Sequence, residues 1–297
     1  MKPIINQSNR KAAFTIVELL TVMSIIVILI SLLVPALNTV KKFAWEVKQK
    51  AQFKSIDVAI ELFNTEFSDY PDSDDRGPDG QPYCGAMKLS EAMMGQDLMG
   101  FHPDSTFRSD GWDRDPQLLG AKHLYPDANS VSAEVYKDNL SVRKRYLPAE
   151  NVDAFRLGSL YADTGPFAAR HFVLCDVYRN VTHRVTGKRV GMPILYYRAS
   201  TANSLHDIIN PDNSNNIYNY RDNQYLIMLG MPWDPLPNGP RHRLQEPQRF
   251  YKNTKNDKVT TTSRPYKEDS YILISAGFDG EYGTPDDICN FEWKYLQ

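Results

Sequence analysis

The chain has 297 residues, of which 42% are hydrophobic and 24% are charged, and its formal net charge is -2. This length accommodates one membrane helix and one globular domain, and the near-neutral charge excludes a protein whose whole surface is basic and attracts nucleic acid. The sequence contains no H-E-x-x-H, G-x-S-x-G or phosphate-loop pattern, so we expect a protein that is not an enzyme.

The N-terminal region contains a long apolar segment. From Leu19 to Leu37 the only side chains that form hydrogen bonds are three small hydroxyls. About 20 apolar residues cross a bilayer as a helix, so the segment predicts one membrane span. The basic residues Lys2, Arg10 and Lys11 precede it and favour a cytoplasmic N-terminus.

One acidic residue, Glu18, lies at the start of this segment. A carboxylate inside a membrane helix costs roughly 2.5 to 3.5 kcal/mol on insertion scales, so Glu18 indicates a function. A cleaved secretory signal with Val34-Pro35-Ala36 as its cleavage site is one alternative, and an uncleaved anchor of a periplasmic enzyme is another. Neither alternative gives Glu18 a purpose.

The stretch Ala13-Phe14-Thr15-Ile16-Val17-Glu18-Leu19-Leu20 resembles the processing motif of type IV pilins and of the pseudopilins of type II secretion systems. In that family a basic leader is cut off before Phe, and Glu is the fifth residue of the mature chain. A cut between Ala13 and Phe14 makes Glu18 the fifth residue here and places Pro35 where many members carry proline. The family usually has Gly before the cut, whereas this chain has Ala13.

The resemblance implies that a prepilin peptidase removes residues 1–13 and methylates the amino group of Phe14. It also implies filament assembly, in which the amino group of Phe14 on one subunit neutralises Glu18 of a neighbour. Because a buried carboxylate is stabilised only when it is paired, Glu18 would select the correct register. Pro35 removes one backbone hydrogen bond and predicts a kink or a local loosening of the helix.

We predict that residues 14–37 form the membrane-spanning half of a long helix and that residues 38–70 form its amphipathic half. Its apolar side chains recur at spacings of three and four and form one face: Phe53, Ile56, Ile60, Phe63 and Phe67. Pro71 predicts that the helix ends near Tyr70. The segment from Val58 to Pro71 also resembles the end of the helix in major pseudopilins.

Residues 71–190 lack clear periodicity and indicate a large irregular insertion, with weak helical patterns at 89–99 and 132–147. Four aspartates follow the first helix: Asp72, Asp74, Asp75 and Asp79. We interpret them as a solvated acidic turn, because Arg76 occupies a ligand position of the EF-hand pattern.

Residues 191–297 predict a β region. Three short segments are rich in aromatic and β-branched residues: Pro193–Ala199, Gln224–Leu229 and Tyr271–Ser275. Packed on the helix, they predict an α+β fold with a small antiparallel sheet. The linker 231–270 is locally basic and could bind phosphate backbones in a DNA-uptake minor pilin, but a solvated loop needs fewer assumptions, so nucleic acid is not expected.

The last predicted strand leads into an acidic, glycine-rich loop from Ser275 to Asp287. Oxygen ligands on a tightly turning loop suit Ca²⁺. The loop also resembles the calcium loop near the C-terminus of major pseudopilins. That resemblance implies side-chain ligands at Asp279, Asp286 and Asp287, with the carbonyls of Ala276 and Glu281 as weaker candidates.

Together these features predict a pilin-like subunit with Ca²⁺ as a structural cofactor. Its expected location is the bacterial inner membrane, with the C-terminal domain in the periplasm. Its expected partners are further pilin-like subunits, prepilin peptidase, the inner-membrane assembly platform and membrane lipid. The alternative is a membrane-anchored periplasmic enzyme or binding protein whose active surface lies in residues 72–190.

Three widely spaced cysteines, Cys84, Cys175 and Cys289, permit one disulfide of undetermined pairing.

Overall fold

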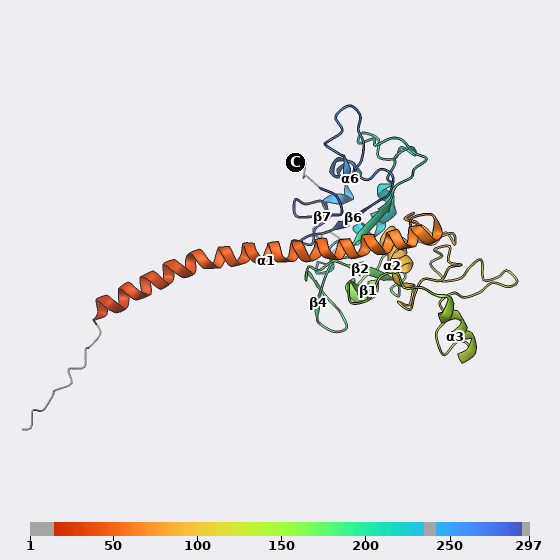
Figure 1. Cartoon of the computed structure of the whole chain (residues 1–297), viewed down its shortest axis with the longest axis horizontal. Helices are drawn as coiled ribbons and strands as arrows, with labels where there is room; N and C mark the ends of the chain where they lie inside the picture. Colours follow the sequence, from red (N-terminus) through yellow and green to blue (C-terminus); the bar gives the residue numbers. More distant parts are fainter. Residues whose placement is uncertain (1–14, 235–241, 293–297) are drawn as a thin grey trace, which may run out of the picture. The chain divides into compact units, whose positions relative to one another are not determined.

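A computed structural model describes residues 15–234 and 242–292, and the chain divides into two compact units, Met1–Ala44 and Trp45–Gln297. Helix α1 (Ile16–Phe67) contributes residues to both units (Figure 1). In the first unit every described side chain is exposed, from residue 15 to residue 44. The helix is long and apolar enough to cross a membrane. The predicted membrane span is therefore helical, and within its own unit no other segment packs against it.

Helix α1 is continuous through Pro35, and the hydroxyl of Thr39 donates to the Pro35 carbonyl oxygen at 3.1 Å. The helix ends at Phe67, close to the predicted end at Tyr70. Ser68 follows with a φ of 57°, in the left-handed region that stops an α-helix.

The predicted apolar face of α1 is buried in the second unit. Phe53, Ile56, Ile60 and Phe63 are at most 3% exposed, and Phe67 is partly buried. Each such side chain contributes about 1.5 to 3 kcal/mol when it is fully buried. The same core contains side chains from four other parts of the chain: Leu89, Leu174, Ile194, Tyr196, Tyr271 and Leu273. This face therefore holds the globular unit on the helix.

The strands form three small antiparallel sheets, as expected for an α+β fold. The largest has the order β5 (Leu195–Arg198), β6 (Tyr271–Ser275), β7 (Ile288–Cys289). The other two pair β1 (Asp153–Arg156) with β2 (Phe172–Cys175), and β3 (Val181–Thr182) with β4 (Arg189–Val190). In Figure 1, β6, β7 and α6 (Pro247–Thr254) are drawn above the C-terminal half of α1, and β1 and β2 below it.

The predicted strand at Gln224–Leu229 is wrong. This segment forms the short helix α5 (Gln224–Met228), directly after the 3₁₀ helix η1 (Tyr220–Asn223). The Asn219 side chain accepts a hydrogen bond from the Arg221 backbone N–H and starts the helical turns. A short apolar run is compatible with both structures, and here the polar cap decides. The third strand of the sheet is β7 instead.

Residues 71–190 supply much of the core. Helix α2 (Gly85–Met94) is buried along its whole length, whereas α3 (Ala133–Val142) has no buried residue. The side chain of Asn223 accepts from the Ala86 backbone N–H at 2.9 Å and donates to the Tyr196 carbonyl oxygen at 2.7 Å. These bonds join α2 to β5 across 110 residues of the sequence. The remaining short helices are α4 (Leu157–Leu160) and η2 (Arg243–Gln245).

Two charged side chains of α2 are buried with their partners. Glu91 accepts hydrogen bonds from four side chains: Tyr83, Gln96, Ser105 and Tyr125. Burial raises the pKa of Glu91, while these bonds lower it. Lys88 pairs with Asp72 and donates to the Arg76 carbonyl oxygen. A buried charge without such partners would strongly destabilise the fold.

All three cysteines are free thiols. Burial raises the pKa of the Cys84 thiol to about 12 and also raises the pKa of Cys175 and Cys289. The thiolate is the reactive form, so the buried Cys84 and Cys175 behave as core residues, while Cys289 is partly exposed.

Asp176 connects the end of β2 to the end of β6. It accepts from the Ser275 hydroxyl at 2.8 Å and from the backbone N–H groups of Tyr178 and Met192 at 3.2 and 3.0 Å. Its side chain is 1% exposed, and burial raises its pKa to about 8 in spite of these bonds. The folded protein therefore binds a proton at Asp176 that the unfolded chain releases at neutral pH.

The substitution Asp176→Asn should make stability less dependent on pH. In the wild type the folded pKa lies above the unfolded value of 3.8, so the stability that Asp176 contributes is lost as the pH rises from about 4 to about 8. The variant has no such loss, and its stability relative to the wild type should rise by up to about 1.4 kcal/mol per pH unit in this range. Urea unfolding of the full chain in detergent at several pH values measures the difference. The exposed Asp257→Asn variant is the control, and a difference that does not change with pH contradicts the expectation.

Candidate functional site

The predicted cleavage and methylation residues, Ala13 and Phe14, lie outside the described residues. The description begins at Thr15, which is the N-cap of α1. Processing at this position remains a prediction.

Glu18 takes part in a capping box with Thr15. Its Oε2 atom accepts from the Thr15 backbone N–H at 2.9 Å and from the Thr15 hydroxyl at 2.8 Å, and the Glu18 N–H donates to the same hydroxyl at 3.2 Å. This arrangement satisfies backbone N–H groups that the first helical turn leaves free. The T-x-x-E spacing in the sequence is the signal for this capping box, and the predicted role of Glu18 did not include it. Glu18 therefore has a local partner in its own chain, whether or not a neighbouring subunit pairs with it.

The acidic loop after β6 folds around its own carboxylates. Asp286 accepts from the Asp279 backbone N–H at 3.0 Å and from the Thr284 hydroxyl at 2.7 Å. Asp279 accepts from the Glu281 N–H at 2.8 Å, and Asp287 accepts from the Gly283 N–H at 2.7 Å. The loop thus gathers all three predicted carboxylate ligands within thirteen residues of chain.

The carboxylates of this loop repel one another. Burial and the nearby Asp286 raise the pKa of Asp279 to about 6. Burial also raises the pKa of Asp287, and both Asp279 and Asp286 add to the effect. The Oδ1 atom of Asp287 is buried and has no hydrogen-bond partner. An excess of negative charge with an unpartnered oxygen is the environment that a bound cation would neutralise.

The fit to a metal ion is partial. Within the described part of the chain, no three acidic, histidine or cysteine side chains are arranged to hold a metal. The donors are the hard oxygens that Ca²⁺ prefers, but each carboxylate also accepts hydrogen bonds from the loop itself. Of the weaker candidates, the Glu281 carbonyl oxygen accepts from the Thr284 hydroxyl at 3.2 Å, and Ala276 is fully buried at the end of β6.

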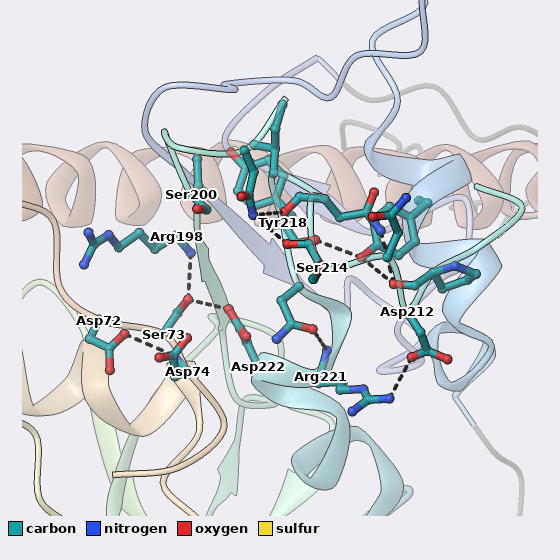
Figure 2. A pocket seen from close by; sticks show the side chains of 18 residues that line it. Asp72, Ser73, Asp74, Arg198, Ser200, Asp212, Ser214, Tyr218, Arg221 and Asp222 are labelled. Carbon is teal, nitrogen blue, oxygen red and sulfur yellow. Dashed lines mark hydrogen bonds and ion pairs between the residues drawn. The ribbon is translucent and has the colours of Figure 1, made fainter. Parts of the chain in front are cut away.

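A polar pocket of about 500 Å³ lies elsewhere in the second unit (Figure 2). Its walls come from the chain after α1, from the end of β5 and from the loop before η1. They carry mainly carboxylates, amides, hydroxyls and two arginines: Asp72, Ser73, Asp74, Arg198, Ser200, Asn203, Asp212, Asn213, Ser214, Asn216, Tyr218, Asn219, Arg221 and Asp222. A volume of this size is typical of small-molecule sites.

Asp222 is the most deeply buried acid of this pocket, at 2% exposure. One carboxylate oxygen accepts from the Ser73 hydroxyl, which also accepts from the Arg198 N–H at 3.0 Å, and the other oxygen has no hydrogen-bond partner. Burial raises the pKa of Asp222, and the nearby Asp74 adds to the effect. The sequence predicts Asp72 and Asp74 as part of a solvated acidic turn, but no local pattern relates them to Asp222, which lies about 150 residues later in the chain.

Comparisons with protein-family models, with curated proteins and with solved structures find no match to this chain.

The substitution Gly277→Ala should disrupt the acidic loop. Gly277 has a φ of 67°, and a Cβ atom there would lie 2.2 Å from the Asp286 carbonyl oxygen. We expect a loss of about 2 kcal/mol or more in the free energy of unfolding, because the strain of a left-handed residue is added to a backbone clash. The matched control is Gly187→Ala, with a φ of 68° and open space around the new Cβ. Urea unfolding should separate the two variants, and equal losses would show that the clash is relieved at little cost.

Proposed function

We propose that this chain is a non-enzymatic, pilin-like subunit that polymerises into a filament of the type II secretion or type IV pilus kind. A prepilin peptidase removes residues 1–13 and methylates Phe14. The precursor lies in the bacterial inner membrane, with the second unit in the periplasm. An assembly platform in that membrane then extracts the subunit from the lipid.

The observation that carries this proposal is the change in character along α1. Its first part is apolar around its whole circumference and exposed, whereas the second part buries one face in the globular unit. An apolar helix of this length needs lipid or other apolar helices around it, because exposed apolar surface of this size is unfavourable in water. A filament core of bundled helices supplies such an environment after the subunit leaves the membrane.

The role of Glu18 follows from its position at the start of this apolar part. Its Oε2 atom accepts hydrogen bonds from Thr15, and within the described residues the Oε1 atom accepts none. The amino group of Phe14 from an adjacent subunit is the donor that processing creates. Pairing in an apolar core stabilises the correct axial register, since an unpaired charge there is costly.

Calcium is the structural cofactor of this proposal. The excess negative charge around Asp279, Asp286 and Asp287 supports a cation at the acidic loop. Ca²⁺ would hold the connection between β6 and β7 in one conformation, and the flexible geometry of its oxygen ligands tolerates a loop that adjusts on binding.

Two alternatives are weaker. The polar pocket favours a membrane-anchored binding protein, and this activity is compatible with a filament subunit. The DNA-uptake alternative depends on the basic linker. Of the eight lysines and arginines in residues 231–270, four already contact carboxylates: Arg243 with Glu281, Arg249 with Glu246, Lys258 with Glu292 and Arg264 with Glu268. Such pairing lowers the positive charge that phosphates would meet.

Substitution at Glu18 tests the filament proposal. In cells that contain the assembly system, Glu18→Ala should remain in the membrane and start at methylated Phe14, but should cross-link into filaments at least about tenfold less, because the intersubunit charge pair is lost. The matched variant Thr15→Ala removes the capping hydroxyl and keeps the carboxylate, so it should still assemble.

Mass spectrometry of the N-terminus and cross-linking of the filament fraction measure the two steps. An uncut N-terminus, or a cut after Ala36, contradicts the processing step. Normal assembly of Glu18→Ala contradicts the proposed role of the carboxylate.

Calcium should raise the melting temperature of the full chain in detergent. At 100 times its dissociation constant a ligand stabilises the folded state by about 2.7 kcal/mol, which corresponds to several degrees for a domain of this size. Asp286→Asn should abolish the shift, while Asp257→Asn, outside the loop, should retain it. No shift in the wild type, or an equal shift in Asp286→Asn, excludes calcium at this loop.

A further inference from the structure

The pocket around Asp222 combines segments that are far apart in the sequence. Asp72, Ser73 and Asp74 come from the chain that follows α1, and Asp222 comes from η1. Figure 2 shows Asp222 next to Ser73, with Asp74 and Arg221 on either side of it. Only the tertiary structure brings these carboxylates to one wall.

The negative charge on this wall is not balanced. Each arginine of the pocket already contacts a carboxylate: Arg198 pairs with Asp69 at 2.8 Å and Arg221 with Asp212 at 2.8 Å. Lys88 pairs with Asp72.

Within the described residues, the Asp74 carboxylate makes no hydrogen bond or close ion pair, and one oxygen of Asp222 has no partner. The charged groups left for a ligand are therefore carboxylate acceptors. A buried acceptor without a donor is costly, so such a group is a place for a ligand that brings the donor.

We propose that this pocket binds a small organic cation through the carboxylates of Asp74 and Asp222, with a primary ammonium group as the recognised chemistry. An ammonium carries three N–H donors and one positive charge. It therefore supplies hydrogen bonds to the unpartnered carboxylate oxygens and balances part of the negative charge of the wall. The serine hydroxyls and amides around them leave room for a short, polar or flexible remainder. This inference concerns a free small molecule and does not depend on filament assembly.

Two other ligand classes fit less well. In the described part of the chain, no three acidic side chains converge as a metal site requires, and Ca²⁺ needs six to eight oxygens. A neutral polyol would satisfy the free acceptors but would leave the negative charge of the wall without a counterion.

Isothermal titration of the full chain in detergent micelles with putrescine tests the proposal. Butane-1,4-diol is the neutral molecule of the same length, and CaCl₂ and MgCl₂ test the metal alternative. We expect putrescine to bind at one site per chain, the diol not to bind, and neither metal to displace putrescine.

Asp74→Asn and Asp222→Asn should each weaken putrescine binding by about tenfold or more, because each removes a charged acceptor. Asp75→Asn, next to the pocket but not part of its lining, should bind as the wild type does.

A melting curve of each variant reports whether it is folded. If the buried Asp222→Asn variant does not fold, the exposed Asp74→Asn variant tests the proposal. The absence of putrescine binding overturns the proposal. Equal binding of the diol assigns the pocket to polyols, and displacement by either metal assigns it to a cation site of another kind. Unchanged binding in Asp74→Asn places putrescine outside this pocket.

Discussion

The burial of one face of α1 organises one of the two hydrophobic cores of the globular unit. Phe53, Ile56, Ile60 and Phe63 are covered by side chains of α2, β2, β5 and β6, which come from widely separated parts of the chain. A second buried core, which includes Met87, Val173, Leu195, Tyr197 and Ile272, packs the same strands and α2 without any residue of α1. Both cores are needed, since isolated sheets of two or three short strands are marginally stable in water. The helix is thus both the membrane-length segment and one wall of the globular unit.

Buried polar groups then determine how the segments connect. Glu91, Asp176 and Asn223 each accept or donate several hydrogen bonds across the core, and each joins parts of the chain that are distant in sequence. Burying such groups is tolerated only when their partners are in place, so they specify one arrangement of α2, β2, β5 and β6. At Asp222 and at Asp287 one buried carboxylate oxygen has no hydrogen-bond partner, and these are the two positions for which we propose ligands.

These two positions differ in kind. The acidic loop is a local feature, since Asp279, Asp286 and Asp287 lie within nine residues, and its composition identified it from the sequence. The pocket depends on contacts over about 150 residues, so no local pattern could indicate it. Both carry excess negative charge in one globular unit, and a cation of different chemistry is proposed for each.

The sequence by itself determined the features whose signal is local. Hydrophobic periodicity identified α1 and its buried face, and Pro71 identified its end. Runs of β-branched and aromatic residues identified β5 and β6. These patterns depend only on neighbouring residues. Only the tertiary structure decided that Gln224–Met228 is a helix, that α2 is wholly buried and that Asp222 lies beside Asp72 and Asp74. Short segments have weak preferences of their own, and long-range packing and hydrogen bonds select among them.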